Sequence, residues 1–377
     1  MKRFFILLVF IPVIVFAEPL YSPTWGFLID LPEGYNFTGG DGKDRFSFSG
    51  PEGLMFETVV YNGRYASILE LVNDINSRLS NQGYADLFQY RDKQAAIINL
   101  NFGESYGWAL AIELGIPEGS PSSSARPMLL ALAYAPSNKK ELELFHISAL
   151  DSICTTPADL RYPGPITEYG SDRGSARNAA LAIRGVNASI RENDAEISQL
   201  LIEREFKIME AYLNTSYIQA ACIRYYRFIY RDSYDRIAEA AAAIARNLGG
   251  NQAVTDDQKR EFAQKVLSFV QGFNYERDLS GSDFINLVTA ITEGRGDCDS
   301  RSMLFALILS KAQINSAIML SHQYSHAMGL ADITGYGARF EAGGTEFLVA
   351  ETTDKINIGL IDQQIGDPRH WFAIIFE

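Results

Sequence analysis

The stretch Gly296-Asp297-Cys298-Asp299 opens the most informative part of this 377-residue chain. Two glycines separated by one residue, Gly294 and Gly296, indicate a tight loop that leads into a helix. That helix is predicted from the apolar spacing after the loop, and its buried face consists of Met303, Leu304, Leu307, Ile308 and Leu309. Cys298 is therefore expected at a helix N-terminus, where unpaired N–H groups and the helix dipole favour a thiolate and can stabilise an oxyanion.

A histidine and an acid follow this cysteine on predicted strands. Residues 314–320 and 325–333 have strand-like patterns, and His326 lies in the second of them. Residues 346–353 form the next predicted strand, with Glu351 near its end. Facing side chains on adjacent antiparallel strands lie about 5 Å apart, so the acid can fix the tautomer of the imidazole. The order is that of a thiol nucleophile, its base and an orienting carboxylate.

Residues from about Phe273 to Gly359 resemble the transglutaminase-like, papain-related superfamily of cysteine enzymes. The resemblance is carried by Gly296 to Asp299, the helix after them, Ser325-His326-Ala327 and Glu351-Thr352-Thr353. It implies a catalytic triad of Cys298, His326 and Glu351. The third residue of that family is usually aspartate, so Glu351 is a departure, and Asp354 is the alternative candidate.

The remaining polar residues near these motifs suggest no metal or cofactor. Asp297 and Asp299 either bind calcium, as in some secreted relatives, or cap the helix N-terminus, and capping is favoured. His322 and His326 have the spacing of a metal pair on a helix, but their segment is predicted to be extended and lacks the accompanying glutamate. His370 and His146 are interpreted as structural. The chain contains neither a nucleotide-binding glycine loop nor a Cys-x-x-Cys pair.

The first 17 residues are typical of a signal peptide. Lys2 and Arg3 precede the apolar run 4–16, and Val15 and Ala17 are small residues at the positions that a signal peptidase reads. The run is shorter than the roughly 20 residues that span a bilayer. We therefore expect export to the periplasm or the extracellular space, with no membrane span after cleavage. Loss of the two basic residues changes the net charge from −13 to −15, which argues against nucleic-acid binding.

Residues 18–155 are predicted to form an N-terminal α/β domain. The segment 25–32 begins it. Strands are expected at 45–49, 54–61, 95–101, 106–114 and 128–134, and helices at 67–79 and 139–152. The order of these elements resembles the small α/β sandwich of the photosystem extrinsic P-subunit (PsbP) type. No catalytic cluster occurs in this part, so we interpret it as a module that docks to a partner or to the cell envelope.

The rest of the chain is divided by composition. Residues 156–175 are rich in proline and glycine and are interpreted as a linker, and residues 176–250 as a nearly all-helical region that packs on the catalytic domain. Residues 251–377 then form the transglutaminase-like catalytic domain. The aromatic cluster within 225–230 is either a ligand groove or core. The predicted fold class of the whole chain is α+β.

Three cysteines, Cys154, Cys222 and Cys298, leave at least one thiol unpaired. Cys154 and Cys222 either form a disulfide, as an oxidising compartment permits, or remain two buried thiols.

Three functions fit these residues. The first is hydrolysis of an amide bond in a protein or in cell-wall peptide, by a cysteine peptidase or amidase. The second is acyl transfer to an amine, as in a protein-crosslinking transglutaminase, because the outcome depends only on which nucleophile reaches the thioester. The third is a non-catalytic binding or scaffold protein that keeps the fold. The expected partner is a protein or peptide substrate, and the sequence does not predict an oligomeric state.

Overall fold

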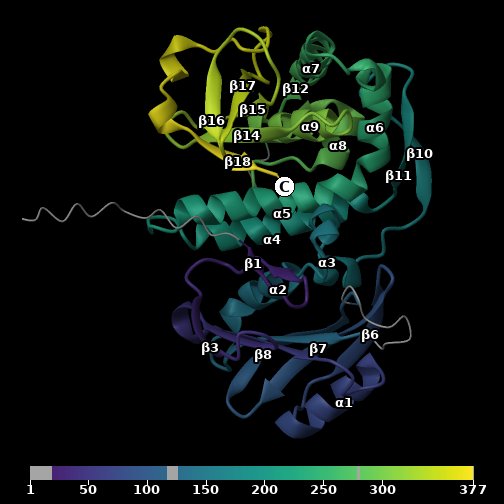
Figure 1. The fold of residues 1–377 in the computed structure, drawn as a ribbon, viewed down its shortest axis with the longest axis vertical. Coiled ribbons are helices and arrows are strands. Elements are labelled where there is room, and N and C mark those ends of the chain that lie inside the picture. Colours follow the sequence, from purple (N-terminus) through teal and green to yellow (C-terminus); the bar gives the residue numbers. More distant parts are fainter. Residues whose placement is uncertain (1–18, 117–125, 278–280, 377) are drawn as a thin grey trace, which may run out of the picture.

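The computed structural model describes residues 19–116, 126–277 and 281–376, which form a mixed α+β fold. Two antiparallel sheets lie at opposite ends of the molecule, and the helices α4 (Asp194–Glu210) and α5 (Ile218–Arg236) run between them (Figure 1). The predicted signal peptide lies outside the described residues. None of the helices in the described ranges has both the length and the apolar character needed to cross a membrane.

The N-terminal sheet has seven strands in the order β3-β4-β5-β9-β8-β7-β6, and every neighbouring pair is antiparallel. Its strands are β3 (Asn36–Gly40), β4 (Arg45–Ser49), β5 (Met55–Tyr61), β6 (Ala85–Tyr90), β7 (Lys93–Phe102), β8 (Ser105–Glu113) and β9 (Met128–Pro136). The strands predicted from the sequence within 45–134 are confirmed. The two outer strands β3 and β6 were not predicted, since Gly39 and Gly40 weaken the pattern of β3 and side chains of β6 remain exposed.

One helix covers each face of this sheet. The helix α1 (Ile68–Leu79) packs Ile68, Leu71 and Ile75 against one face, and α2 (Glu143–Asp151) packs against the other. The central strands are consequently buried on both faces, which explains their continuous apolar runs such as 95–98 and 128–133.

The central helices α4 and α5 are tied to the N-terminal unit by buried charges. Arg224 of α5 donates to Glu205 of α4, to the Ser148 hydroxyl of α2 and to the Asp30 carbonyl, at 2.9, 2.7 and 2.9 Å. Arg231 donates to four backbone carbonyls between Asp151 and Tyr162. The predicted linker is part of this junction, since two of these carbonyls belong to it. It contains two short helices, η3 (Pro157–Arg161) and α3 (Pro165–Tyr169).

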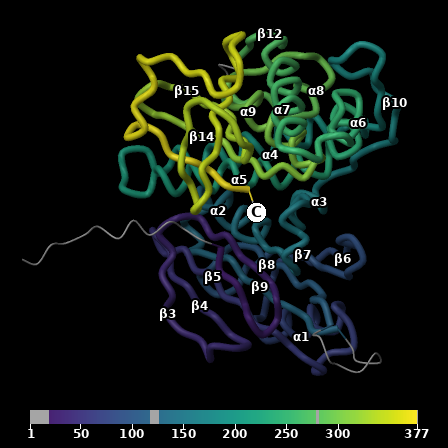
Figure 2. The backbone as a smooth tube through the Cα atoms, turned by 45° about the horizontal axis from the view of Figure 1, so that its top comes forward, coloured from purple at the N-terminus to yellow at the C-terminus, as the bar shows by residue number. Residues whose placement is uncertain are grey.

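Residues 176–191 form a hairpin and not the predicted helix. The strands β10 (Ala176–Ala180) and β11 (Asn187–Arg191) pair antiparallel, and the hairpin lies beside α6 (Ala238–Asn247) at one edge of the molecule (Figures 1 and 2). Burial alternates along β11, where Ala188 and Ile190 reach the core. This tertiary packing overrides the helical propensity of the alanine-rich sequence.

The C-terminal sheet has five antiparallel strands in the order β16-β17-β15-β14-β18. They are β14 (Ser316–Ser321), β15 (His326–Ala331), β16 (Arg339–Ala342), β17 (Thr345–Ala350) and β18 (Phe372–Ile375). The predicted strands that correspond to β14, β15 and β17 are confirmed. The helix α9 (Cys298–Ser310) packs against β14 and β15, and α6, α7 (Asp256–Gln271) and α8 (Leu287–Glu293) contact α9.

Small elements complete the chain. A parallel bridge between β12 (Asn274–Tyr275) and β13 (Arg295–Gly296) brings Tyr275 beside the start of α9. The others are β1 (Leu20–Tyr21), β2 (Leu28–Ile29), η1 (Pro51–Gly53), η2 (Lys140–Leu142), η4 (Gly250–Gln252), η5 (Gln363–Ile365) and η6 (Pro368–His370).

Candidate active site

The three predicted catalytic residues come from three neighbouring elements of the C-terminal unit. Cys298 is the first residue of α9, His326 is the first residue of β15, and Glu351 directly follows β17. Because β15 lies between β14 and β17 and packs against α9, these element ends meet (Figure 1). Cys298 and His326 line the same cavity, which has a volume of about 220 Å³.

His326 and Glu351 are in direct contact. The distance between His326 Nε2 and Glu351 Oε2 is 2.8 Å, and Glu351 Oε1 accepts from the backbone N–H and the hydroxyl of Thr353 at 2.8 and 2.6 Å. Burial raises the pKa of Glu351, but the bond and charge of His326 and the bonds of Thr353 outweigh it, so the pKa is below its usual value. Asp354 is exposed, so Glu351 is the acid that contacts the imidazole.

The thiol of Cys298 is surrounded by acids. It is 7% exposed, and its sulfur lies 3.7 Å from Asp299 Oδ1, while Asp299 Oδ2 accepts from the Tyr226 hydroxyl at 2.9 Å. Burial and the negative charges of Asp299 and Asp297 raise the pKa of Cys298 above its ordinary value. The predicted position at a helix start is correct, but the expected lowering of the thiol pKa is wrong for this resting site.

The two aspartates beside Cys298 have different roles. Asp297 is the N-cap of α9, since its Oδ1 accepts from the Ser300 N–H at 2.8 Å, so the prediction of capping is confirmed for this residue. Asp299 instead binds Tyr226. Burial raises the pKa of both carboxyls. Within the described ranges, no group of three or more His, Cys, Asp or Glu side chains is arranged to hold a metal ion.

Arg301 organises the site, and the sequence reasoning did not identify it. This guanidinium is 2% exposed and donates to the carbonyls of Gly296 and Phe273 at 3.0 and 2.8 Å, and more weakly to that of Thr352 at 3.4 Å. It thereby joins the loop before Cys298 to the segment after Glu351. A signal was present, because an arginine just before the buried apolar run that begins at Met303 needs acceptors for its guanidinium.

Trp371 was also missed. Its ring lies edge-to-face on His326, with the ring centres 6.2 Å apart, and it is 7% exposed. It therefore shields the imidazole side of the His326–Glu351 pair from water. The rim of the cavity carries His322 and the ion pair between Arg277 and Asp283.

The other residues considered from the sequence do not contact the His326–Glu351 pair. His146 is fully buried in α2, and burial lowers its pKa to about 4. His370 lies near the site and contacts the Tyr324 ring. All three cysteines are free thiols, so Cys154 and Cys222 do not form a disulfide. The aromatic residues 225–230 are buried core, although Tyr226 also reaches the cavity of Cys298.

A scan against protein-family models finds no match for this chain, and a search of the curated proteins finds none either.

Proposed function

We propose that this protein is an exported cysteine hydrolase of the transglutaminase-like superfamily that cleaves an amide bond in a protein or in cell-wall peptide. The observation that carries the proposal is the 2.8 Å contact between His326 Nε2 and Glu351 Oε2 beside the cavity that Cys298 lines. Cys298 is the nucleophile, His326 the general base and Glu351 the group that orients the imidazole.

The geometry suggests how the proton moves. Glu351 engages Nε2, so Nδ1 is the nitrogen left to accept the proton of the thiol. The sulfur attacks the substrate carbonyl, the C–N bond breaks, and the imidazolium returns its proton to the leaving amine. Water then adds to the thioester, again losing a proton to His326, and releases a carboxylic acid and the free thiol.

The start of α9 supplies a donor for the oxyanion. The N–H of Cys298 is at the first helical position, and it has no hydrogen-bond acceptor within the described part of the chain. Such a group is suited to the negative oxygen of a tetrahedral intermediate. Because burial and the neighbouring acids raise the pKa of the thiol, His326 is proposed to act during attack and not through a preformed ion pair.

The first test is alkylation of the purified protein with iodoacetamide between pH 5 and 10, with modified sites read by mass spectrometry. We expect Cys298 to react, and His326→Ala and Glu351→Gln to slow that reaction by about tenfold or more. Cys154 is the internal control because it is 1% exposed and does not line the cavity of Cys298. A Cys298 that is inert, or indifferent to His326, would contradict the enzyme proposal and favour the binding or scaffold protein.

The second test separates hydrolysis from acyl transfer. Dimethylcasein is incubated with the protein, with and without dansylcadaverine as an amine acceptor. Hydrolysis predicts new carboxyl groups or shorter peptides and little incorporated dye. Incorporation of dye that depends on Cys298 would instead favour the crosslinking transglutaminase.

A further inference from the structure

A second, larger cavity lies beside the candidate active site, and we call it the central cavity. It has a volume of about 770 Å³ and lies between α5, the β1–β2 region and the C-terminal sheet. Aromatic and aliphatic side chains dominate its wall, including Phe228, Tyr230, Phe340, Phe372, Ile375 and Phe376. This size and lining are typical of a ligand site at a junction between structural units.

Both edge strands of the C-terminal sheet border the central cavity. β16 pairs only with β17, and β18 pairs only with β14, so each has one edge without a strand partner among the described residues. The turn after β16 lies close to β18, since a Cβ on Gly343 would lie 2.5 Å from Ile375 Cδ1. Unpaired strand edges beside apolar pockets are the features with which proteins bind extended peptides.

The central cavity and the active-site cavity are lined by neighbouring residues at two places. On α5, Cys222 and Tyr226 line the active-site cavity, and the neighbouring Ile223 lines the central cavity. At β18, Phe372 lines the central cavity, while its ring lies 5.5 Å from that of His322 at the rim of the active site. An extended chain in the central cavity would therefore pass close to Cys298.

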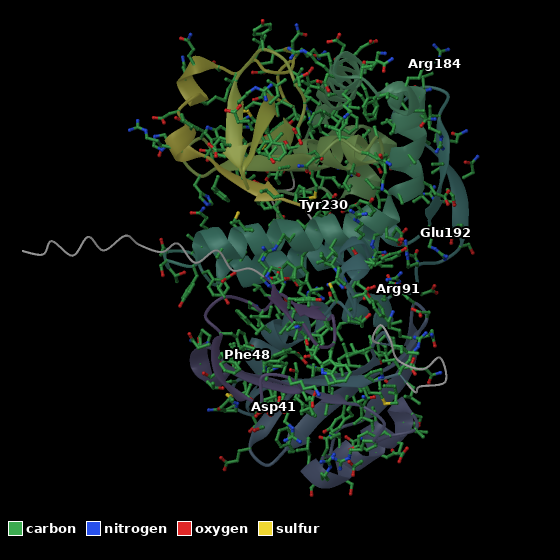
Figure 3. The ribbon with its side chains drawn as sticks, viewed as in Figure 1. Asp41, Phe48, Arg91, Arg184, Glu192 and Tyr230 are labelled. Atoms are coloured by element: carbon green, nitrogen blue, oxygen red, sulfur yellow. The ribbon has the colours of Figure 1, made fainter. Side chains whose placement is uncertain are left out.

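Part of the wall of the central cavity is formed by Tyr230 of α5 and by Phe376. Tyr230, labelled in Figure 3, stacks on Phe376 with the ring centres 4.0 Å apart and the planes 2° from parallel. This pair is part of the apolar wall. The wall of the cavity thus contains both these stacked rings and Phe372, whose ring lies beside His322 at the rim of the active site.

We propose that the central cavity is a substrate subsite, which binds an extended, apolar segment of a polypeptide along β18 and so delivers a nearby carbonyl to Cys298. This inference rests on the proposed function of Cys298 and His326. It names the substrate class as a polypeptide with apolar residues next to the reacting bond. Side chains of that segment enter the apolar cavity, and its backbone pairs with the free edge of β18.

The test compares two peptidyl chloromethyl ketones of equal length and with the same last residue. One is acetyl-Val-Phe-Val-Phe-Ala chloromethyl ketone and the other is acetyl-Ser-Gln-Ser-Gln-Ala chloromethyl ketone. In both, the sulfur of Cys298 displaces chloride, so the intrinsic chemistry is the same. We expect the apolar reagent to label Cys298 at least about tenfold faster, because only its side chains gain from burial in the central cavity.

Variants locate the effect. Ile223 is partly exposed on the wall of the central cavity, so Ile223→Glu introduces a charge there and Ile223→Trp fills space. Both are expected to bring the ratio of the two labelling rates close to one. The matched control is Leu200→Glu on α4, a position that is 65% exposed, and it should retain the ratio. Thermal melts verify that each variant is folded.

The outcomes separate this inference from the proposed function. If iodoacetamide labels Cys298 in a His326-dependent way but both peptides react equally, or if Ile223→Glu keeps the ratio, the subsite is wrong and the enzyme proposal stands. If Cys298 is inert or indifferent to His326, both fail. A third probe is acetyl-Val-Phe-Val-Phe-Ala amide, which has the apolar sequence but no chloromethyl ketone. If it binds without slowing the labelling of Cys298, the central cavity is a separate ligand site and the subsite is wrong.

Discussion

The surroundings of Cys298 consist of residues that lie far apart in the sequence. Its helix position and the pairing of His326 with Glu351 were predicted, because each residue belongs to a recognisable element and their order along the chain is informative. The contact between Asp299 and Tyr226 was not predicted, since Tyr226 belongs to a helix of another region. Short-range patterns carry no information on such contacts, and these set the charge around the thiol.

Asp299→Asn is expected to make Cys298 a stronger nucleophile at neutral pH. The change removes a negative charge 3.7 Å from the sulfur and keeps a polar group that can bind the Tyr226 hydroxyl. The pKa of the thiol should fall, because a nearby negative charge disfavours the thiolate. The measurement is the pH dependence of the iodoacetamide reaction, with Asp354→Asn as an exposed acidic control. A midpoint that stays in place or rises would show that Asp299 does not repel the thiolate.

At the scale of elements, the sequence predicted best where a continuous apolar run is buried on nearly every side. Helix α9 and strands β14, β15 and β17 were found in this way. The hairpin β10–β11 was missed because its alanine-rich strands have little intrinsic strand preference and are held by packing on α6. The outer strands β3 and β6 were missed because few of their side chains are buried.

Gly329 of β15 allows α9 to approach the sheet closely. A Cβ at this position would lie 2.5 Å from Phe305 Cδ1 of α9, and Phe305 is fully buried. Gly329→Ala should therefore destabilise the fold by about 1–3 kcal/mol and displace the strand that begins with His326. Urea unfolding measures the first effect, and the rate of Cys298 alkylation measures the second.

The control for this change is Gly39→Ala in β3, where a Cβ would have no neighbour within 4 Å. That variant should unfold at nearly the same urea concentration as the wild type. Equal midpoints for Gly329→Ala and Gly39→Ala would mean that α9 and β15 can separate at no cost, contrary to the close packing described above.

At the scale of the whole molecule, α5 is the element that both units share. One part of its surface carries Arg224, which binds the N-terminal unit, and another carries Cys222 and Tyr226 beside Cys298. The composition of the chain indicated a helical region here. However, α5 is buried both against the N-terminal unit and against the C-terminal unit, and this leaves no simple amphipathic pattern. The role of α5 as a junction was therefore not predictable from periodicity.

Arg224→Ala should be strongly destabilising. The arginine is 3% exposed, and its loss leaves the Glu205 carboxylate, also buried, without one of its ionic partners, together with an unpaired carbonyl at Asp30. Removal of one partner of such a buried pair costs about 3–5 kcal/mol. Lys265→Ala, which breaks an exposed pair with Glu261, should cost no more than about 1 kcal/mol. Similar urea midpoints for both variants would contradict the structural role of Arg224.

Glu33 should make the junction between the N-terminal unit and the central helices weaker as the pH rises. It is 6% exposed, and its Oε1 has no hydrogen-bond partner within the described residues. Burial raises its pKa from 4.5 to about 7, although Arg224 opposes this shift. Between these two values the unfolded chain loses the proton while the folded protein keeps it. Stability should therefore fall through this interval by about 3 kcal/mol and then remain constant above pH 7.

Glu33→Gln isolates this effect, because the amide stays neutral at every pH. The free energy of unfolding is measured with urea at pH 5 and at pH 8. From pH 5 to pH 8 it should fall more in the wild type than in Glu33→Gln. Glu104→Gln, at an exposed loop position, is the matched control and should follow the wild type. If the wild type and Glu33→Gln change in parallel between pH 5 and pH 8, Glu33 ionises equally in the folded and unfolded chains, and the junction is not the source of the pH dependence.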